Sequence, residues 1–435
     1  MSKHIKVLSI SVIIVFVVVG FVAFRDKSEV AIKSVVKKKN IYPNLNTTII
    51  SNKLTDSSQF DLVNKSFEQF VTKWGLTGAS IAIAKDGKLI YTRGFGYANK
   101  EDKQRMQPYN TMRVASVSKL ITATAIMKLV EDGKLTLDDK VFGTNGILND
   151  TIFLKYKDKR VEDITVYNLL NHSAGWRSRW GDHMFIKEVI AKELGKELPI
   201  SLNDIVVFAL SKKLHFTPGS GSSYSNLGYG VLQLVIERVT KGSYEEYIKA
   251  NIFEPLNIYD AHLSENWDSL RYSNEARYYE VPEAELIMAY DGSTDKVLKS
   301  RGGNDVKMLG AAGGWIISSI NLTKFILAID GDDSFPDIIS KKSVATMAVA
   351  DEKFQPLGWR WVMHGKLWRS GSLAGTTALA VSRSDGYTYI FISNCSPWKG
   401  ARFPYIIDRF MDKTLPKFDK LHFNDLFYYG IASKN

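Results

Sequence analysis

Two β-hairpin patterns near opposite ends of this 435-residue chain constrain its fold most strongly. Residues 79–84 and 88–93 alternate in polarity around an Asp-Gly turn. Residues 375–382 and 387–393 flank a Ser-Asp-Gly turn, and a further strand is predicted just before them, at residues 357–364. A sheet that contains both hairpins must therefore be assembled from the two ends of the chain.

Apolar residues at helical spacing fill most of the interval between the hairpins. The predicted helices cover residues 116–132, 163–171, 202–211, 227–240, 243–251 and 321–330, and a last helix is predicted at 403–413. Strands at both ends with helices between them predict an α+β fold, an α/β sandwich. In this fold one antiparallel sheet is built from both chain ends, helices flank it, and an inserted helical region forms the other side of a cleft.

The N-terminal segment has the composition of a membrane anchor. Residues 7–24 form an 18-residue run without a charge, which spans or nearly spans a bilayer. We expect residues 1–25 to be an uncleaved transmembrane anchor, with a cleaved signal peptide as the main alternative and a buried core helix as a minor one. An anchor or a signal peptide would each place the remaining chain outside the cytoplasm, in the periplasm or the extracellular cell envelope. If the segment is cleaved, the protein would be secreted.

Positive charge is concentrated beside that segment. The formal net charge is +11, and residues 1–50 contain eight Lys or Arg against two acidic residues. This distribution favours anionic lipid headgroups and argues against a nucleic-acid partner. We expect a polar basic tether at 26–61, a folded domain at 62–412 and a C-terminal tail at 413–435. The only cysteine, Cys395, cannot form an intrachain disulfide.

A serine and a lysine mark the start of the most apolar predicted helix. Ser116 and Lys119 share one helical face, because residues three apart are neighbours there. The same spacing occurs three more times in the chain, but only Ser116 is followed by a long apolar helix. Burial would lower the pKa of Lys119 and provide a neutral amine to accept the serine proton. The alternative is a capping serine beside a solvated lysine.

Two other strings supply groups that fit this chemistry. Tyr224 and Asn226 follow a Thr-Pro-Gly loop, and a loop tyrosine beside a cation can relay a proton, although packed tyrosines are commoner. The string Arg369-Ser370-Gly371-Ser372 precedes the strand at 375–382. On an edge strand its cation and hydroxyl would hold a carboxylate, and Gly371 would let the N–H of Ser372 complete an oxyanion site. The alternative is a surface arginine at a strand start.

In this order and context, the three strings resemble the serine β-lactamase and penicillin-binding-protein superfamily, most of all its class C-like branch of β-lactamase-related hydrolases. The resemblance covers roughly residues 62–412. It implies that Ser116 is the nucleophile, that Lys119 is its base partner and that Tyr224 is a proton shuttle. It therefore implies a serine hydrolase, and the N-terminal segment leads us to expect that the hydrolase is exported.

The resemblance also implies roles for the remaining polar residues. Asn226 would bind the substrate amide, and Arg369, Ser370 and the N–H of Ser372 lie where the family has Lys-Thr-Gly. Arg369 departs from that pattern, and because a guanidinium does not easily give up a proton we expect it to bind a carboxylate. His172 is expected to shape the cleft wall.

The implied reaction proceeds through an acyl-enzyme on Ser116, with peptide, amide or ester substrates. The enzyme would be D-alanyl-D-alanine carboxypeptidase-like or esterase-like, with peptidoglycan as a candidate partner and the membrane contacted through the N-terminal segment. Alternatives are a β-lactamase that hydrolyses β-lactam antibiotics, a non-catalytic penicillin- or cell-wall-binding module, and a structural membrane-associated protein. The mechanism calls for no metal or cofactor, and the seven histidines show no ligand spacing.

Overall fold

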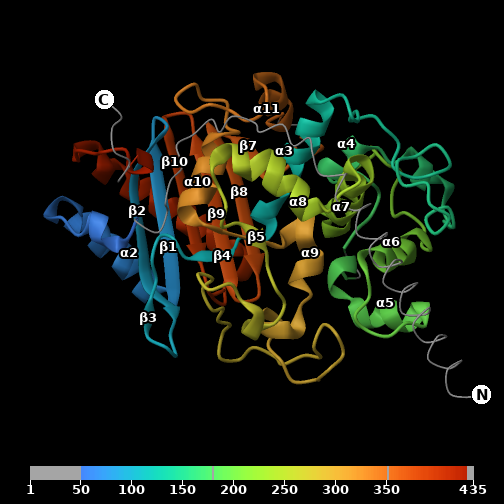
Figure 1. Ribbon diagram of the computed structural model, residues 1–435, viewed down its shortest axis with the longest axis horizontal. Coiled ribbons are helices and arrows are strands. Elements are labelled where there is room, and N and C mark those ends of the chain that lie inside the picture. Colours follow the sequence, from blue (N-terminus) through green and yellow to red (C-terminus); the bar gives the residue numbers. More distant parts are fainter. Residues whose placement is uncertain (1–49, 179–180, 350–351, 429–435) are drawn as a thin grey trace, which may run out of the picture. The chain divides into compact units, whose positions relative to one another are not determined.

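A computed structural model of the protein describes residues 50–178, 181–349 and 352–428 (Figure 1). The predicted anchor at residues 1–25 lies outside these residues, as does the predicted tether as far as residue 49. Among the described helices, none is both long and apolar enough to cross a membrane.

A seven-stranded antiparallel sheet has the strand order β3-β2-β1-β10-β9-β8-β7. Its strands are β1 (Gly78–Lys85), β2 (Lys88–Asn99), β3 (Gln104–Arg105), β7 (Trp361–Met363), β8 (Lys366–Leu373), β9 (Thr376–Arg383) and β10 (Tyr387–Ser393). β1 pairs with β10 from Ala79 opposite Ser393 to Lys85 opposite Tyr387. In Figure 1 the blue N-terminal strands accordingly lie beside the red C-terminal strands. The prediction of one sheet built from both chain ends is confirmed.

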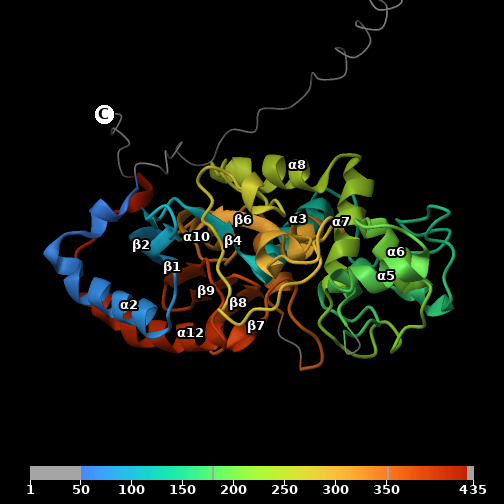
Figure 2. The same cartoon turned by 90° about the horizontal axis from the view of Figure 1, so that it is seen from below.

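Helices cover both faces of this sheet and fill the inserted region (Figures 1 and 2). They are α2 (Asp61–Lys73), α3 (Ser118–Glu131), α4 (Val166–Leu170), α5 (Lys187–Leu194), α6 (Leu202–Leu210), α7 (Asn226–Thr240), α8 (Tyr244–Ile248), α9 (Val306–Gly313), α10 (Ser319–Leu327), α11 (Lys341–Met347) and α12 (Phe403–Thr414). The predicted helices correspond to α3, α4, α6, α7, α8, α10 and α12, which confirms the α+β class. A second, small sheet has the order β4 (Thr111–Arg113), β6 (Trp315–Ser318) and β5 (His262–Leu263), and was not predicted.

Side-chain alternation along the central strands divides the interior into two cores. On β1, Ile81 and Ile83 belong to an outer core with residues of α2 and α12. Ala82 and Ala84 of the same strand face an inner core, where α10 packs on β1, β9 and β10. Because alanine projects little beyond the backbone, α10 can approach this face of the sheet closely. Both faces are therefore covered, which explains why the central strands are buried along nearly their whole length.

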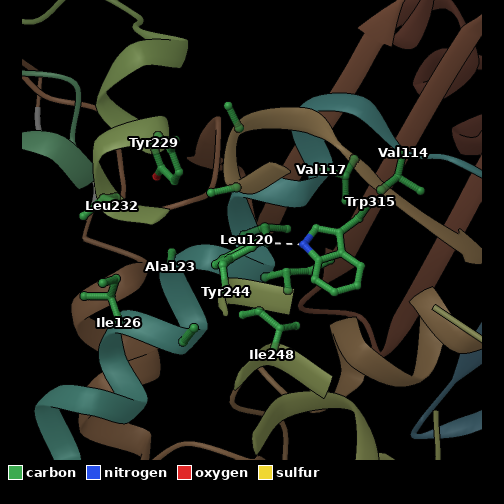
Figure 3. Close-up of a cluster of buried hydrophobic side chains, with 14 of the residues drawn as sticks. Val114, Val117, Leu120, Ala123, Ile126, Tyr229, Leu232, Tyr244, Ile248 and Trp315 are labelled. Carbon is green, nitrogen blue, oxygen red and sulfur yellow. Dashed lines mark hydrogen bonds between the residues drawn. The ribbon is translucent and has the colours of Figure 1, made fainter. Parts of the chain in front are cut away.

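Helix α3 is buried around most of its circumference, as its apolar sequence predicts. Figure 3 shows Leu120 and Ala123 of this helix among side chains from α7, α8 and β6. Within this cluster the Trp315 indole N–H donates to the Tyr244 hydroxyl at 3.0 Å, and that hydroxyl is 2.8 Å from the Thr122 hydroxyl. The polar atoms of two large buried aromatic residues are thus satisfied without water.

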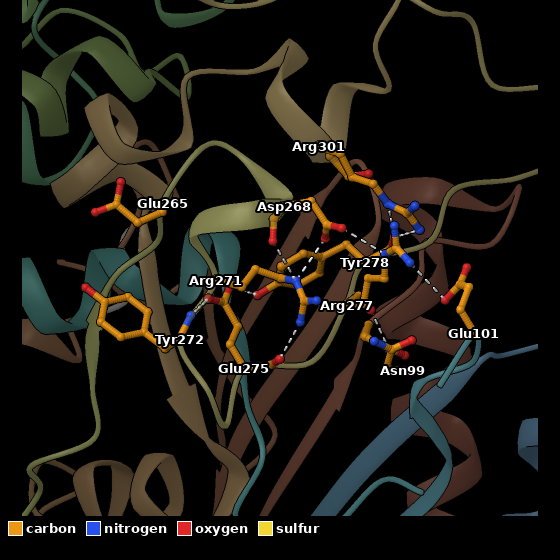
Figure 4. Close-up of polar contacts among 12 residues, drawn as sticks. Asn99, Glu101, Glu265, Asp268, Arg271, Tyr272, Glu275, Arg277, Tyr278 and Arg301 are labelled. Carbon is orange, nitrogen blue, oxygen red and sulfur yellow. Dashed lines mark hydrogen bonds and ion pairs between the residues drawn. The ribbon is translucent and has the colours of Figure 1, made fainter. Parts of the chain in front are cut away.

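A polar network anchors the long segment between β5 and α9. Figure 4 shows Arg277 between Asp268 and Glu101, with nitrogen–oxygen distances of 2.9 and 3.3 Å. Arg113 of β4 is buried and donates to the Ser264 hydroxyl and to the Ser300 carbonyl oxygen, at 2.7 Å each. This segment is therefore fastened to the strand that leads directly to Ser116.

The folded domain extends beyond its predicted bounds at both ends. In the predicted tether, the Asn52 side-chain amide donates to the carbonyl oxygens of Gly94 and Met106, at 3.0 Å each. In the predicted tail, Phe418 is buried edge-on against Tyr91 in the outer core. Parts of the predicted tether and tail, residues 50–61 and 413–428, thus contact the folded domain through a few anchoring side chains.

We expect Tyr244→Phe to destabilise the fold and Tyr247→Phe to leave it nearly unchanged. Tyr244→Phe leaves the buried Trp315 N–H without an acceptor, which costs about 1–3 kcal/mol in the free energy of unfolding. The Tyr247 hydroxyl is buried and has no hydrogen-bond partner among the residues described, so its removal sacrifices no such bond. Denaturant unfolding followed by tryptophan fluorescence measures both variants, and equal losses would contradict this explanation.

Candidate active site

Ser116 lies in a tight turn between β4 and α3. A 3-10 turn, Ala115–Val117, connects the strand to the helix, so Ser116 precedes α3 rather than lying in its first α-helical turn as expected. Ala115 has φ +47°, in the left-handed region that most side chains avoid. This strained turn leaves Ser116 half-buried, with its hydroxyl directed at the group described next.

A cavity of about 340 Å³ opens beside Ser116. Six predicted site residues line it: Ser116, Tyr224, Asn226, Arg369, Ser370 and Ser372. The remaining wall consists of Phe185, Leu309, Ala312, Gly313, Arg360, Leu373, Ala401 and Tyr405. The cavity thus lies between α7, α9 and β8, at the boundary between the sheet and the inserted helices, where the sequence predicted a cleft.

Tyr224 is the hydrogen-bond partner of the Ser116 hydroxyl. The phenol oxygen of Tyr224 lies 2.8 Å from Ser116 Oγ, in the loop that immediately precedes α7. Burial alone would raise the pKa of this phenol, but the positive charges of Lys119 and Arg369, together with hydrogen bonding to Lys119 and Ser116, lower it to about 8. The phenolate in contact with the serine is therefore formed at lower pH than it would be in water.

Lys119 lies one turn along from Ser116 and is completely buried. Its ammonium Nζ donates to the Asn226 side-chain oxygen at 2.7 Å and to the Ala312 carbonyl oxygen, and lies 4.9 Å from the Tyr224 ring centre. Burial lowers the pKa of Lys119 to about 8, although the negative charge of an ionised Tyr224 opposes the shift. The two groups therefore titrate as a coupled pair.

Asn226 connects Lys119 to a carboxylate that the sequence did not single out. While its oxygen accepts from Lys119, its amide nitrogen donates to Asp182 at 2.8 Å. These two bonds fix which end of the amide faces the lysine. Asp182 also caps the short helical turn His183–Phe185 by accepting from the Met184 N–H. Asp182 is therefore placed to orient Asn226.

Arg369 borders the cavity but is almost entirely buried. Its side chain is 1% exposed, Nε donates to the Ser116 carbonyl oxygen at 2.8 Å, and Nη2 donates to the Tyr224 oxygen at 3.2 Å. Its third nitrogen is sealed from solvent and has no partner among the described residues. The guanidinium thus hydrogen-bonds to Tyr224 and to the backbone of Ser116. From the sequence we expected it to hold a substrate carboxylate.

Strand β8 brings its backbone against the serine turn. It is the second strand from the edge of the sheet, not the edge itself. Because β7 pairs only with Lys366–Trp368, residues 369–373 have no strand neighbour on that side among the described residues. A Cβ at Gly371 would lie 2.0 Å from the Val114 carbonyl oxygen and 3.0 Å from Ser116 N. Only glycine permits this approach, which brings the Ser116 backbone nitrogen close to the Ser370–Ser372 stretch that borders the cavity.

His172 supports the tyrosine loop from behind. Its ring is buried, its Nδ1 accepts from the Ser225 N–H at 3.2 Å, and its ring centre lies 4.6 Å from that of Tyr224. Burial and the nearby positive charges of Lys119 and Arg369 hold the pKa of His172 well below its usual range. A neutral imidazole bonded to the backbone is a positioning group, and His172 supports the cavity through Tyr224 rather than lining it.

Three residues with polar side-chain groups at the site were not identified from sequence. Asp182 contacts Asn226, while Arg360 and Tyr405 line the cavity. Arg360 lies within the predicted strand at 357–364 and Tyr405 within the predicted helix at 403–413, so each had an ordinary structural explanation. Asp182 lies in a polar loop without any periodic pattern, and no local signal distinguishes it.

The sequence is similar to those of known proteins. A sequence model of the Beta-lactamase family matches residues 63–407. Protein flp of Staphylococcus aureus (strain N315) is 30% identical over 229 residues, which cover 53% of this chain and 43% of that protein. The chain thus matches less than half the length of that relative. Penicillin-binding protein 4* of Bacillus subtilis (strain 168) is 25% identical over 353 residues, which cover 75% of this chain and 70% of that protein.

A solved structure agrees with these matches. The octameric penicillin-binding protein homologue from Pyrococcus abyssi superimposes with a TM-score of 0.60 and 26% identity, over 82% of this chain and 76% of that one. The family match spans most of the chain and includes all three strings that form the cavity. The chain therefore belongs to the β-lactamase family, within the superfamily of serine β-lactamases and penicillin-binding proteins.

Proposed function

We propose that this protein is a serine hydrolase that forms an acyl-enzyme on Ser116 with a peptide, amide or ester. The hydrogen bond between Tyr224 and Ser116 carries the proposal, because it places a phenol with a lowered pKa on a hydroxyl that borders an open cavity. A phenolate there can accept the serine proton without rearrangement of the site. Membership of the β-lactamase family supports the same reaction class.

Acylation then follows from the contacts of Ser116. The Tyr224 phenolate takes the proton of Ser116 Oγ while Oγ bonds to the substrate carbonyl carbon, whose π electrons move to oxygen. The backbone N–H groups of Ser116 and Ser372 stabilise that oxyanion. When the bond to the leaving nitrogen or oxygen breaks, the leaving atom takes the proton from Tyr224. Water repeats the sequence to release the acyl group and restore Ser116.

In this mechanism Lys119 and Arg369 act through Tyr224. Their positive charges stabilise the phenolate, so Tyr224 is the immediate base, whereas we expected Lys119 in that role from the sequence. Support comes from the contacts, because the Tyr224 oxygen lies 2.8 Å from Ser116 Oγ, whereas the Lys119 amine donates to Asn226 and Ala312. Asn226 faces the cavity, where it is placed to bind the substrate amide.

For the substrate, we favour D-alanyl-D-alanine carboxypeptidase-like hydrolysis over hydrolysis of β-lactam antibiotics. The excess of cationic side chains at the site supports an anionic substrate, and the similarity to penicillin-binding protein 4* of Bacillus subtilis is consistent with a cell-wall peptide. The uncharged run at residues 7–24 supports a location outside the cytoplasm, beside peptidoglycan. A short ester is the second candidate, since the same serine chemistry acts on it.

A fluorophosphonate probe tests the nucleophile. We expect the full-length protein to be labelled on one serine, and Ser116→Ala to lose the label, because the probe reacts with an activated hydroxyl. Ser220→Ala is the matched control, since Ser220 is an exposed serine in the loop before Tyr224. Intact mass and peptide mapping locate the label. Undiminished labelling of Ser116→Ala would rule out the proposed nucleophile, and an adduct with penicillin that never hydrolyses would indicate a binding module.

The pH dependence of activity tests the role of Tyr224. With a neutral ester, kcat/KM is expected to rise with pH through an apparent pKa near 8, because only the phenolate accepts the proton. Arg369→Leu removes a positive charge that stabilises the phenolate, so the rise should move to higher pH, whereas Arg369→Lys should keep it nearer its original position. Tyr224→Phe should lower kcat/KM by about 10²- to 10⁴-fold. An unshifted profile in Arg369→Leu would contradict this electrostatic account.

A further inference from the structure

A groove lies between α2 and α12, on the outer face of the central sheet. It encloses about 480 Å³, and Figure 2 shows the two helices side by side. Four exposed basic residues, which we call the groove cations, line it: Lys73, Arg409, Lys413 and Lys417. Among the described residues, no carboxylate lines the groove, and the groove shares no lining residue with the cavity beside Ser116. It is therefore a separate cationic surface that is open to solvent.

Helix α12 places its negative and positive charges on different faces. Asp408 and Asp412 point toward the sheet, where the Lys366 ammonium of β8 lies 3.0 and 2.8 Å from their carboxylate oxygens. Arg409 and Lys413 each follow one of these acids in sequence and line the groove instead. Because the acids are paired on the sheet side, the groove cations form no ion pair within the described part of the chain. Their charge is available to an external anion.

The floor beneath these cations is apolar. Phe70 of α2 and Phe410 of α12 stack with their ring centres 4.3 Å apart, and Ile406 and the half-buried Trp74 lie beside them. The aliphatic stems of Lys and Arg can lie along such a surface while their charged ends reach outward. Basic ends beside an apolar strip are the arrangement with which helices bind the boundary between lipid headgroups and acyl chains.

The place where the chain enters the folded domain favours a membrane as the source of the anion. The side-chain amide of Asn64, on α2, donates to the Thr55 carbonyl oxygen at 2.8 Å, so the N-terminal part of the described chain lies against α2. Residues 26–49 reach at most about 85 Å even when fully extended. An anchor at residues 1–25, as the sequence leads us to expect, would therefore keep the groove close to lipid at a high effective concentration.

We propose that the groove cations bind the phosphate groups of anionic lipids, so that the folded domain contacts the membrane surface through α2 and α12. This contact is additional to the one expected of the N-terminal segment, and it does not depend on the hydrolase function. Helix α12 also contributes Tyr405 to the cavity beside Ser116. Binding of the groove to lipid therefore fixes the position of that cavity relative to the membrane surface.

A fluorescent label in the groove tests the proposal. Gln69→Cys places a thiol on the exposed wall of the groove, and the native Cys395 is buried, so the label attaches to the new cysteine. The full-length protein is mixed with phosphatidylcholine vesicles that contain a headgroup nitroxide quencher, with or without phosphatidylglycerol. We expect phosphatidylglycerol to increase the quenched fraction, and high salt to abolish this increase, because the attraction is electrostatic.

Arg409→Gln/Lys413→Gln removes two groove cations. Each basic side chain near an anionic surface strengthens binding about fivefold, so the ratio of quenched to unquenched label should fall by about 30-fold. Time-resolved fluorescence measures that ratio. Lys73→Gln, on the other helix, should lower it about fivefold, and this variant tests the groove even if the double variant fails to fold. Denaturant midpoints equal to that of the wild-type protein show that folding is intact.

Two controls are located in the inserted helical region, far from the groove in Figure 1. Lys192→Gln/Lys213→Gln removes two exposed cations there and should leave the quenching at residue 69 unchanged. A label at the exposed Asn203, introduced by Asn203→Cys on α6, should show little quenching with either type of vesicle. Equal quenching at residues 69 and 203 would mean that the domain has no preferred orientation and would overturn the proposal.

Other results would also contradict binding of anionic lipid by the groove. One is equal quenching with and without phosphatidylglycerol, and another is an equal loss of quenching in the groove variant and in the Lys192/Lys213 control. Polyphosphate in solution distinguishes a soluble phosphate polymer from a lipid surface. If polyphosphate binds the wild-type protein with loss of that binding in Arg409→Gln/Lys413→Gln, while phosphatidylglycerol vesicles give no quenching, the lipid assignment is wrong.

Discussion

The site depends on the burial of two cationic side chains beside a phenol. Lys119 and Arg369 are removed from water without a carboxylate partner among the described residues, and this costs several kcal/mol for each ion. Hydrogen bonds to Asn226, Ala312 and the Ser116 carbonyl oxygen recover part of that cost. The remaining desolvation cost is reduced when Tyr224 carries a negative charge. The burial that destabilises these two cations therefore lowers the free energy of the form of Tyr224 that accepts a proton.

The scaffold around these cations explains how they are held. Lys119 is on a helix buried on nearly all sides, and Arg369 is on a strand whose next residues approach the serine turn as closely as backbone allows at Gly371. The pairing of β1 with β10 makes β8 part of the same sheet as the N-terminal hairpin. Positions far apart in the chain are thereby fixed to within the short distances that proton transfer requires.

The sequence predicted those parts of the molecule that local patterns determine. The hairpins, the apolar helix after Ser116 and the helix after Tyr224 all followed from turn residues and periodicity, and the structure brings the three strings together around one cavity. Long-range packing, which no local pattern reports, determines the other features. These are the position of β8 within the sheet, the small second sheet, and the contact between Asn226 and Asp182. The direction of the Arg369 side chain belongs to the same class, because an arginine on a strand can face either solvent or the interior.

The segments on either side of residues 63–407, which match the family model, affect how the protein unfolds. Asn52 is bonded to β2 from one end of the chain, and from the other end Phe418 packs in the outer core while Asp425 accepts from the Leu89 N–H of the same strand. Both flanks thus share contacts with a strand of the central sheet. They are expected to open together with that sheet as one cooperative unit, so that a protease would find its first cuts elsewhere on the surface.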